Sequence, residues 1–337
     1  MPPIRRRCTP KFAVIVLLLW LFLALLFQLK DELRNLPPGA EVFVENDLDG
    51  SDFTSDQRKL ITQNPTKRRT AVVVASQRTE DPSWLFTNFP DWEKNIYAVD
   101  NQSAPLTVPQ NKGRESMVYL TYIIDNYNNL PDNVLFIHPN RYQWHNDDPD
   151  YDGLPMLRHF QLPYLEKEGY VNIRCAWSLG CPAEIKPLEE EGEHRAQVHA
   201  GGDYKQAFEV LFPGIEVPKF VGVSCCAQFA ATRDKIRERP RKDYESYREW
   251  LLNTTLADSI SGRILEYSWH MIFGKESVHC PSAEECYCKV FGLCNLECKE
   301  RGSCTGRYIL PPFSTLPEGW PVIGWQGEPR NRTAPET

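Results

Sequence analysis

The sequence predicts an α/β fold: a mainly parallel sheet flanked by helices, placed behind one N-terminal membrane helix. Short apolar runs at 70–76, 95–99 and 133–137 are typical of strands buried on both faces. Residues 113–129 carry apolar side chains at helical spacing, and Pro131 follows them. Because strands and helices alternate along the chain, we expect the strands to pair in parallel.

The later elements are predicted from weaker patterns. We expect a helix over 154–169, a strand over 170–176, and a strand that enters a helix over 221–232. Two further helices are expected at 242–252 and 260–273. Residues 70–279 then form the α/β domain, and the Pro- and Gly-rich tail at 305–337 is expected to be loop.

The N-terminus predicts a membrane anchor. Residues 12–29 form an apolar stretch of near-spanning length, and the preceding tail, 1–11, is basic. A cleaved signal peptide is the alternative, but no small-residue cleavage site follows. We therefore expect a single-pass type II protein of the ER or Golgi membrane, with a polar stem at 30–69 and a luminal domain. The net charge of −7 excludes a basic nucleic-acid binder.

Cysteine usage supports an oxidising compartment. Ten cysteines follow the apolar stretch, and six of them lie within 280–304. We predict a disulfide module there and a separate Cys175–Cys181 link, with zinc as the alternative reading. The cysteines expected in disulfides are Cys175, Cys181, Cys280, Cys286, Cys288, Cys294, Cys298 and Cys304. Glycosylation acceptor triplets begin at Asn101, Asn253 and Asn331.

Polar residues follow the predicted strands, where ligands bind in parallel α/β sheets. The candidates at strand ends are Arg78, Asp100, His138, His145 and Asp147. Taken singly, each residue has an ordinary explanation, because loops at strand ends are usually polar and solvated. The convergence of these residues is therefore the functional signal. We expect them to meet in one cleft.

The start of the 113–129 helix adds two substrate-binding candidates. Arg114 can hold a phosphate in two-pronged fashion, and a helix N-terminus attracts anions, with Glu115 beside it. A helix cap with a surface arginine is the alternative.

Two further patterns bear on chemistry. His138 and Asp147 could hold a divalent metal, manganese or zinc, although their spacing matches no standard motif. Glu266 and His270 are four residues apart and form either an acid/base pair or a hydrogen-bonded pair inside a core. The sequence contains no phosphate-binding or dinucleotide-binding glycine motif.

Several long motifs resemble the fungal domain-of-unknown-function 3431 family. They are NKGRES at 111–116, VLFIH at 134–138, WHND at 144–147, GYVNIRC at 169–175, CCAQFAATRDKI at 225–236 and SGRILEYSWHMIFG at 261–274. More loosely, the layout is similar to glycosyltransferases of the GT-A type. That resemblance implies an Asp-x-Asp at a strand end for metal and sugar nucleotide, yet 136–140 reads FIHPN. Either His138 with Asp147 substitutes, or transfer is metal-independent, or the scaffold has lost catalysis.

Three functions remain open on the sequence. The first is a luminal glycosyltransferase that uses a nucleotide-sugar donor and a glycan, lipid or metabolite acceptor. The second is a non-catalytic luminal protein that binds glycans or assists a secretory or metabolite pathway. The third is a metal-dependent hydrolase built on His138, His145 and Asp147. The catalytic candidates are His138, His145, Asp147 and Glu266, and the substrate-binding candidates are Arg78, Asp100, Arg114 and Glu115.

Overall fold

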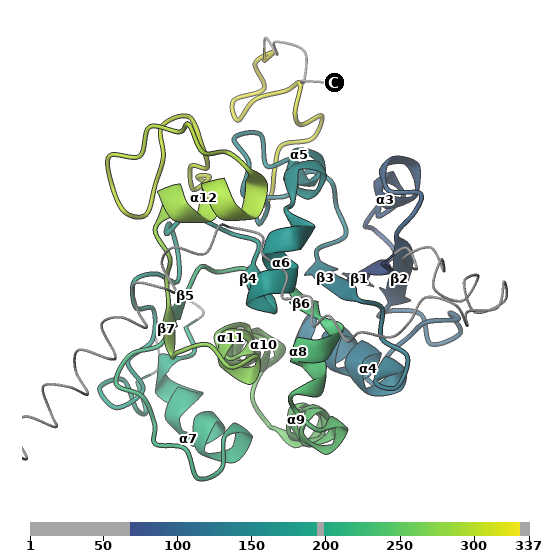
Figure 1. Ribbon diagram of the computed structural model, residues 1–337, viewed down its shortest axis with the longest axis vertical. Coiled ribbons are helices and arrows are strands. Elements are labelled where there is room, and N and C mark those ends of the chain that lie inside the picture. Colours follow the sequence, from purple (N-terminus) through teal and green to yellow (C-terminus); the bar gives the residue numbers. More distant parts are fainter. Residues whose placement is uncertain (1–67, 194–198, 331–337) are drawn as a thin grey trace, which may run out of the picture. The chain divides into compact units, whose positions relative to one another are not determined.

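The computed structural model describes residues 68–193 and 199–330, and its centre is a five-stranded sheet (Figure 1). The strand order is β2-β1-β3-β6-β4. The strands are β1 (Thr70–Ser76), β2 (Glu93–Ala98), β3 (Asn133–Ile137), β4 (Tyr170–Asn172) and β6 (Phe229–Thr232). β1 pairs in parallel with β2 and β3, and β6 runs antiparallel to both its neighbours, β3 and β4. The prediction of a mainly parallel sheet is therefore confirmed, with one strand reversed.

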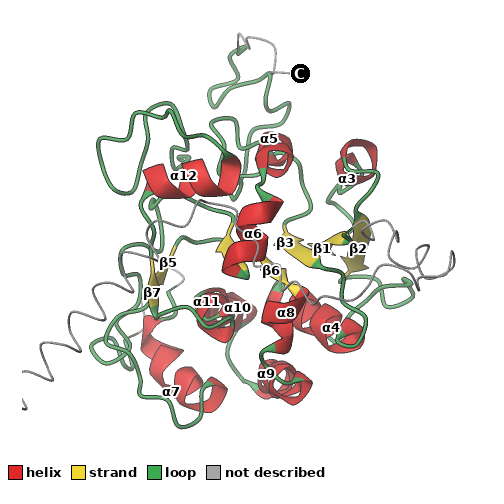
Figure 2. Ribbon diagram, viewed as in Figure 1, coloured by secondary structure: helices red, strands yellow, loops and turns green. Residues whose placement is uncertain are grey.

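Helices cover both faces of this sheet (Figure 2). One face carries α4 (Ser116–Asn126), α7 (Gly201–Leu211), α8 (Arg233–Arg237), α9 (Arg241–Asn253), α10 (Asp258–Glu266) and α11 (Trp269–Ile272). The other carries α3 (Trp84–Asn88), α5 (Gly153–His159), α6 (Leu162–Glu168) and α12 (Ala283–Phe291). Strand side chains alternate between these two cores: Val73 packs in the first, Val72 and Val74 in the second.

Several expected elements are divided in the structure. The helix expected over 154–169 is two helices, because Pro163 in the first turn of α6 cannot continue a helix from α5. The helix expected over 260–273 breaks after Glu266. The strand expected over 170–176 ends at Asn172, whose side chain accepts from Arg174 N–H at 2.8 Å.

The segment expected as one strand over 221–232 also divides. β5 (Gly222–Val223) pairs in parallel with β7 (Val278–His279) in a separate two-stranded sheet, and β6 belongs to the main sheet. Between β5 and β6, Cys226 and Ala227 have positive φ values of 90° and 49°, which interrupts extended structure.

The cysteines form five disulfides among the described residues. Cys288–Cys294 and Cys298–Cys304 confirm the expected module, and the full pairing leaves no thiolates for the zinc alternative. The expected Cys175–Cys181 link is wrong. Cys175, buried on the α12 side of the sheet, bonds to Cys286 of α12, and Cys181 bonds to Cys280 just after β7. Proximity in sequence misled the prediction because the two side chains face different elements. The fifth disulfide joins Cys225 and Cys226.

Within the described ranges, no helix is long and apolar enough to cross a membrane. The predicted anchor at 12–29 lies outside them, and so does Asn331. Of the other glycosylation acceptors, Asn253 is exposed at the end of α9 and Asn101 is partly exposed. The described part of the tail, 305–330, contains no helix or strand.

Candidate functional site

The loops that follow β1, β2 and β3 contact one another at the carboxyl edge of the sheet. Arg78 N–H donates to an Asp100 carboxylate oxygen at 2.9 Å, and Asp81 N–H donates to Asn140 Oδ1 at 2.9 Å. Arg78 and Asp100 are both exposed. The loops after β1, β2 and β3 therefore lie together at this edge of the sheet.

The turn before α4 has an unusual backbone. Gly113 and Arg114 have positive φ values of 67° and 54°, so α4 starts at Ser116, later than expected. A Cβ on Gly262 of α10 would lie 3.0 Å from Gly113 O, which shows how closely the two elements pack. A non-glycine residue in the left-handed region costs of order 1–3 kcal/mol, and such residues concentrate at functional sites. Arg114 is exposed at this turn and Glu115 is partly buried behind it.

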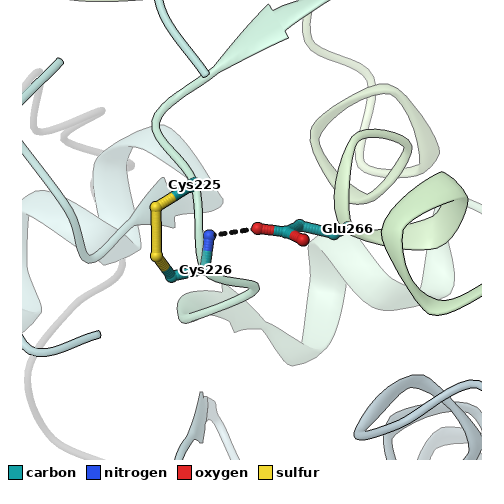
Figure 3. A group of neighbouring side chains, drawn as sticks. All are labelled: Cys225, Cys226 and Glu266. Carbon is teal, nitrogen blue, oxygen red and sulfur yellow. Dashed lines mark hydrogen bonds between the residues drawn. A yellow bond between two sulfur atoms is a disulfide. The ribbon is translucent and has the colours of Figure 1, made fainter. Parts of the chain in front are cut away.

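The disulfide-bonded pair Cys225–Cys226 lies at the centre of a second group of candidate residues (Figure 3). Cys226 N–H donates to a Glu266 carboxylate oxygen from α10. His138 Nε2, just beyond β3, lies 2.8 Å from Cys226 O, and Arg174 Nη1, just beyond β4, lies 3.3 Å from Cys226 Sγ. Cys226, whose φ is positive, thus contacts the ionisable side chains of Glu266, His138 and Arg174, which come from three different parts of the fold.

The two predicted histidines stack on each other. The ring centroids of His138 and His145 are 4.3 Å apart at 24° between planes, and the Trp144 ring packs against His145 in a tilted arrangement, with centroids 4.1 Å apart. Burial lowers the pKa of His138, and it lowers the pKa of His145 well below the ordinary value, assisted by the positive charges nearby. Both rings are therefore neutral at pH 7. Cys226 O accepts from His138 Nε2–H, and Gln143 Nε2 donates to His145 Nδ1 at 2.8 Å, which fixes the two tautomers.

Two buried carboxyl groups at this site, Glu115 and Glu266, have raised pKa values. Burial raises the pKa of Glu115 to about 7, against the opposing charges of Arg114 and Arg263. Burial also raises the pKa of Glu266, and Glu115 raises it further, while Arg263 and the Cys226 N–H oppose the shift. A carboxyl group that titrates near neutral pH can accept and return a proton during a reaction, and such groups concentrate at active sites.

Other predicted residues lie elsewhere or have other partners. Asp147 is fully buried and accepts from Cys175 N–H at 2.5 Å, Ala176 N–H at 3.0 Å and Tyr287 O–H at 2.6 Å. Those bonds tie the 140–148 loop to β4 and α12, so we assign Asp147 a structural role. His270 is buried and bonds Ser277 O rather than Glu266, so neither form of the expected Glu266–His270 pair occurs.

The expected metal site does not fit the residues that the structure describes. Both Asp147 oxygens accept hydrogen bonds within the protein, and His138 Nε2–H donates to Cys226 O. The one set of three metal-type ligands found in the described ranges is Cys225, Cys226 and Glu266, within 4.8 Å of one another. Both sulfurs are joined in a disulfide and are not thiolates, so this set is unsuited to zinc.

Sequence reasoning missed two arginines and the role of the adjacent cysteines. Arg174 is 2% exposed, its guanidinium stacks 3.9 Å from the Tyr308 ring, and its Nε and Nη2 have no partner among the described residues. Arg263 lies three residues before Glu266, so its charge reaches the same site. The adjacent pair Cys225-Cys226 was a visible signal, because a disulfide between neighbours forces an unusual turn.

A family model described as a protein of unknown function, DUF3431, matches residues 72–289. The chain belongs to this family. The match covers β1 through most of α12, and so includes every residue of the cluster around Cys226. No curated protein and no solved structure matches the chain.

Proposed function

We propose that the chain is a glycosyltransferase of the secretory pathway that moves a sugar from a nucleotide diphosphate donor to a hydroxyl acceptor. The observation that carries this proposal is a carboxylic acid, Glu115, at the start of α4, whose pKa burial raises to about 7 although the charges of Arg114 and Arg263 act to lower it. Glycosyl transfer needs a base for the acceptor hydroxyl and positive charge for the departing diphosphate, and this cluster supplies both.

The proposed step is a direct displacement at the anomeric carbon. The acceptor oxygen forms a bond to that carbon as its proton passes to the Glu115 carboxylate. The bond between the anomeric carbon and the diphosphate oxygen breaks, and its electron pair leaves with the nucleoside diphosphate. Arg114 and Arg263 then stabilise the charge on that leaving group, aided by the N-terminus of α4. In this assignment two arginines neutralise the leaving diphosphate. The GT-A resemblance implies instead that a metal ion held by an Asp-x-Asp motif does so.

In this proposal Glu266, His138 and Arg174 are positioning residues. All three hold the Cys226 turn, and the neutral His138 ring keeps His145 stacked at the cleft. We propose no metal-dependent hydrolase, because Asp147 accepts three hydrogen bonds from within the protein. A non-catalytic glycan-binding protein stays as the second candidate, favoured by an aromatic-lined pocket next to the cluster.

Donor binding tests the proposal. The 337-residue chain in detergent is titrated calorimetrically with UDP, GDP and their sugar conjugates, with and without manganese. We expect one nucleotide series to bind, and Arg114→Ala and Arg263→Ala each to weaken it by roughly 10- to 100-fold, the loss of a charge-assisted hydrogen bond. Arg241→Ala is the matched control, since Arg241 is exposed at the start of α9 and pairs with Glu245. Absence of binding by every nucleotide rejects a transferase of this kind.

The proposed location rests on the residues at 12–29, before the described ranges. We propose that this segment anchors a type II protein with its main domain in the ER or Golgi lumen. Protease protection of a C-terminal tag in intact microsomes tests this topology. Digestion of the tag without detergent contradicts it.

A further inference from the structure

A pocket of about 440 Å³ adjoins the candidate site. One wall is the loop after β3, from Asn140 to His145, and Glu80 after β1 adds to it. The opposite wall is the tail segment 314–320. This volume lies within the roughly 300–1,000 Å³ typical of small-molecule sites. His145 lines the pocket and stacks on His138, so the pocket opens directly beside the Cys226 cluster.

The lining combines flat aromatic rings with side-chain amides. Trp144, Tyr142 and Trp320 line the pocket and are all partly exposed. Asn140 Oδ1 accepts from Asp81 N–H, and no partner for its Nδ2 occurs in the described ranges. Gln143 Nε2 donates to His145, and its Oε1 is likewise without a partner there. The lining therefore offers ring faces, one amide donor and one amide acceptor.

The two tryptophans are held in place before any ligand arrives. Trp320 Nε1–H donates to Asp150 O at 2.8 Å, and the Arg330 guanidinium lies 4.0 Å from its ring centroid. The Trp144 ring packs against the His145 ring in a tilted arrangement, and Trp144 O accepts from Tyr308 O–H at 3.0 Å. A prearranged surface loses little conformational entropy on binding.

The charges of the lining argue against an anionic ligand. Among the described residues, no arginine or lysine lines the pocket, Glu80 contributes a carboxylate, and the His145 ring is neutral. This contrasts with Arg114 and Arg263, the two arginines to which the proposed function assigns the diphosphate. A ligand that fits this lining has apolar faces that pack on the aromatic rings. It also has hydroxyl groups that bond to the amides and the Glu80 carboxylate, and it carries no negative charge. A neutral sugar does so, because its ring has C–H faces and a rim of hydroxyls.

We propose that this pocket binds a neutral oligosaccharide, with a sugar ring stacked on Trp144. Carbohydrate binding here does not depend on catalysis. The use of this site for the acceptor of the transfer reaction rests on the proposed function.

Binding is measured without any nucleotide, so the test separates the pocket from the transferase. The 337-residue chain in detergent is titrated with manno-, cello-, laminari- and chito-tetraose and with tetragalacturonate as the anionic probe, and tryptophan fluorescence is recorded. At least one neutral tetrasaccharide binds and tetragalacturonate does not. Trp144→Ala weakens binding about tenfold or more, as expected for a central aromatic anchor, and Trp144→Phe restores most of it. Trp92→Ala, a partly exposed tryptophan outside the lining, leaves it unchanged.

Three results overturn the proposal: no neutral probe binds, binding is insensitive to Trp144→Ala, or tetragalacturonate binds more tightly than every neutral probe. If neutral sugars bind at Trp144 but no donor is bound or consumed, the transferase fails and the pocket stands. If a donor is consumed and Trp144→Ala leaves the acceptor KM unchanged, the acceptor role fails and the transferase stands.

Discussion

Replacing Glu115 with glutamine should stabilise the protein at neutral and alkaline pH. Burial raises the pKa of Glu115 from 4.5 to about 7 in the folded state. The folded protein therefore keeps a proton over this window that the unfolded chain has released. Since the folded state binds more protons there, the free energy of unfolding falls as the pH rises from 4.5 through 7.

The size of this effect follows from the pKa difference. Each pKa unit corresponds to about 1.4 kcal/mol, so the loss approaches about 3 kcal/mol above pH 7. Glu115→Gln keeps the neutral form at every pH and escapes the loss. Because Glu115 also raises the pKa of Glu266, relief of that second carboxyl has the same sign. The variant should match the wild type near pH 4 and exceed it by up to about 3 kcal/mol near pH 8.

Urea unfolding with intact disulfides, followed by tryptophan fluorescence at pH 4, 5, 6, 7 and 8, measures this difference. Glu318→Gln, which removes an exposed carboxylate of the tail, is the control and should show no such trend. A stability difference between Glu115→Gln and the wild type that stays flat across this range would refute the reasoning. The same variant should lose activity, because a buried ionisable group that serves catalysis lowers the stability of the folded protein.

Three further predictions concern groups that hold the fold and the site. Removing the Cys175–Cys286 disulfide alone should cost about 3 kcal/mol, because the nested Cys181–Cys280 bond leaves only the two short segments 175–181 and 280–286 for it to close, about a dozen residues. Removing both of these bonds should cost far more than removing Cys288–Cys294, which closes six residues and should cost about 2 kcal/mol, and denaturant unfolding that ranked them in reverse would contradict this. Asp147→Asn should lower the free energy of unfolding by roughly 1–3 kcal/mol, because it weakens buried hydrogen bonds, and should leave kcat per folded molecule unchanged. A stable but inactive variant would place Asp147 in the site. Replacing both Cys225 and Cys226 with serine should reduce kcat about tenfold or more, because the turn that holds Glu266 and His138 becomes free to move. The far-UV circular dichroism should change little. An unchanged kcat would show that the disulfide does not organise the site.

The sequence predicted the main sheet well where local pattern decides structure. β1 and β3 have the expected bounds, because an apolar β-branched run buried on both faces leaves little alternative. It failed where single residues interrupt a pattern: Pro163 divides one helix, and positive φ at Arg114 delays another. α7 was missed altogether, since it opens with two glycines and carries little helical signal.

The candidate site was predictable only in part. Strand ends identified His138 and His145, and the helix start identified Arg114 and Glu115, because these positions follow from the topology of a parallel sheet. Asp147 was chosen by the same rule, yet its side chain turns inward to Tyr287. Arg174 and Arg263 reach the site through tertiary packing that no local pattern encodes. The raised pKa of Glu115 depends on burial and so appears only in the folded structure.

The most direct test of the proposed transfer chemistry is the pH dependence of nucleoside diphosphate release. The wild type and Glu115→Gln are compared at saturating donor between pH 5 and 9, with a neutral tetrasaccharide as acceptor. If the Glu115 carboxylate accepts the acceptor proton, kcat for the wild type rises through an apparent pKa near 7. Glu115→Gln should lose both this limb and at least about 100-fold in kcat. A wild-type rate that does not change between pH 6 and 8, or a Gln variant that retains the full rate and profile, would contradict the account.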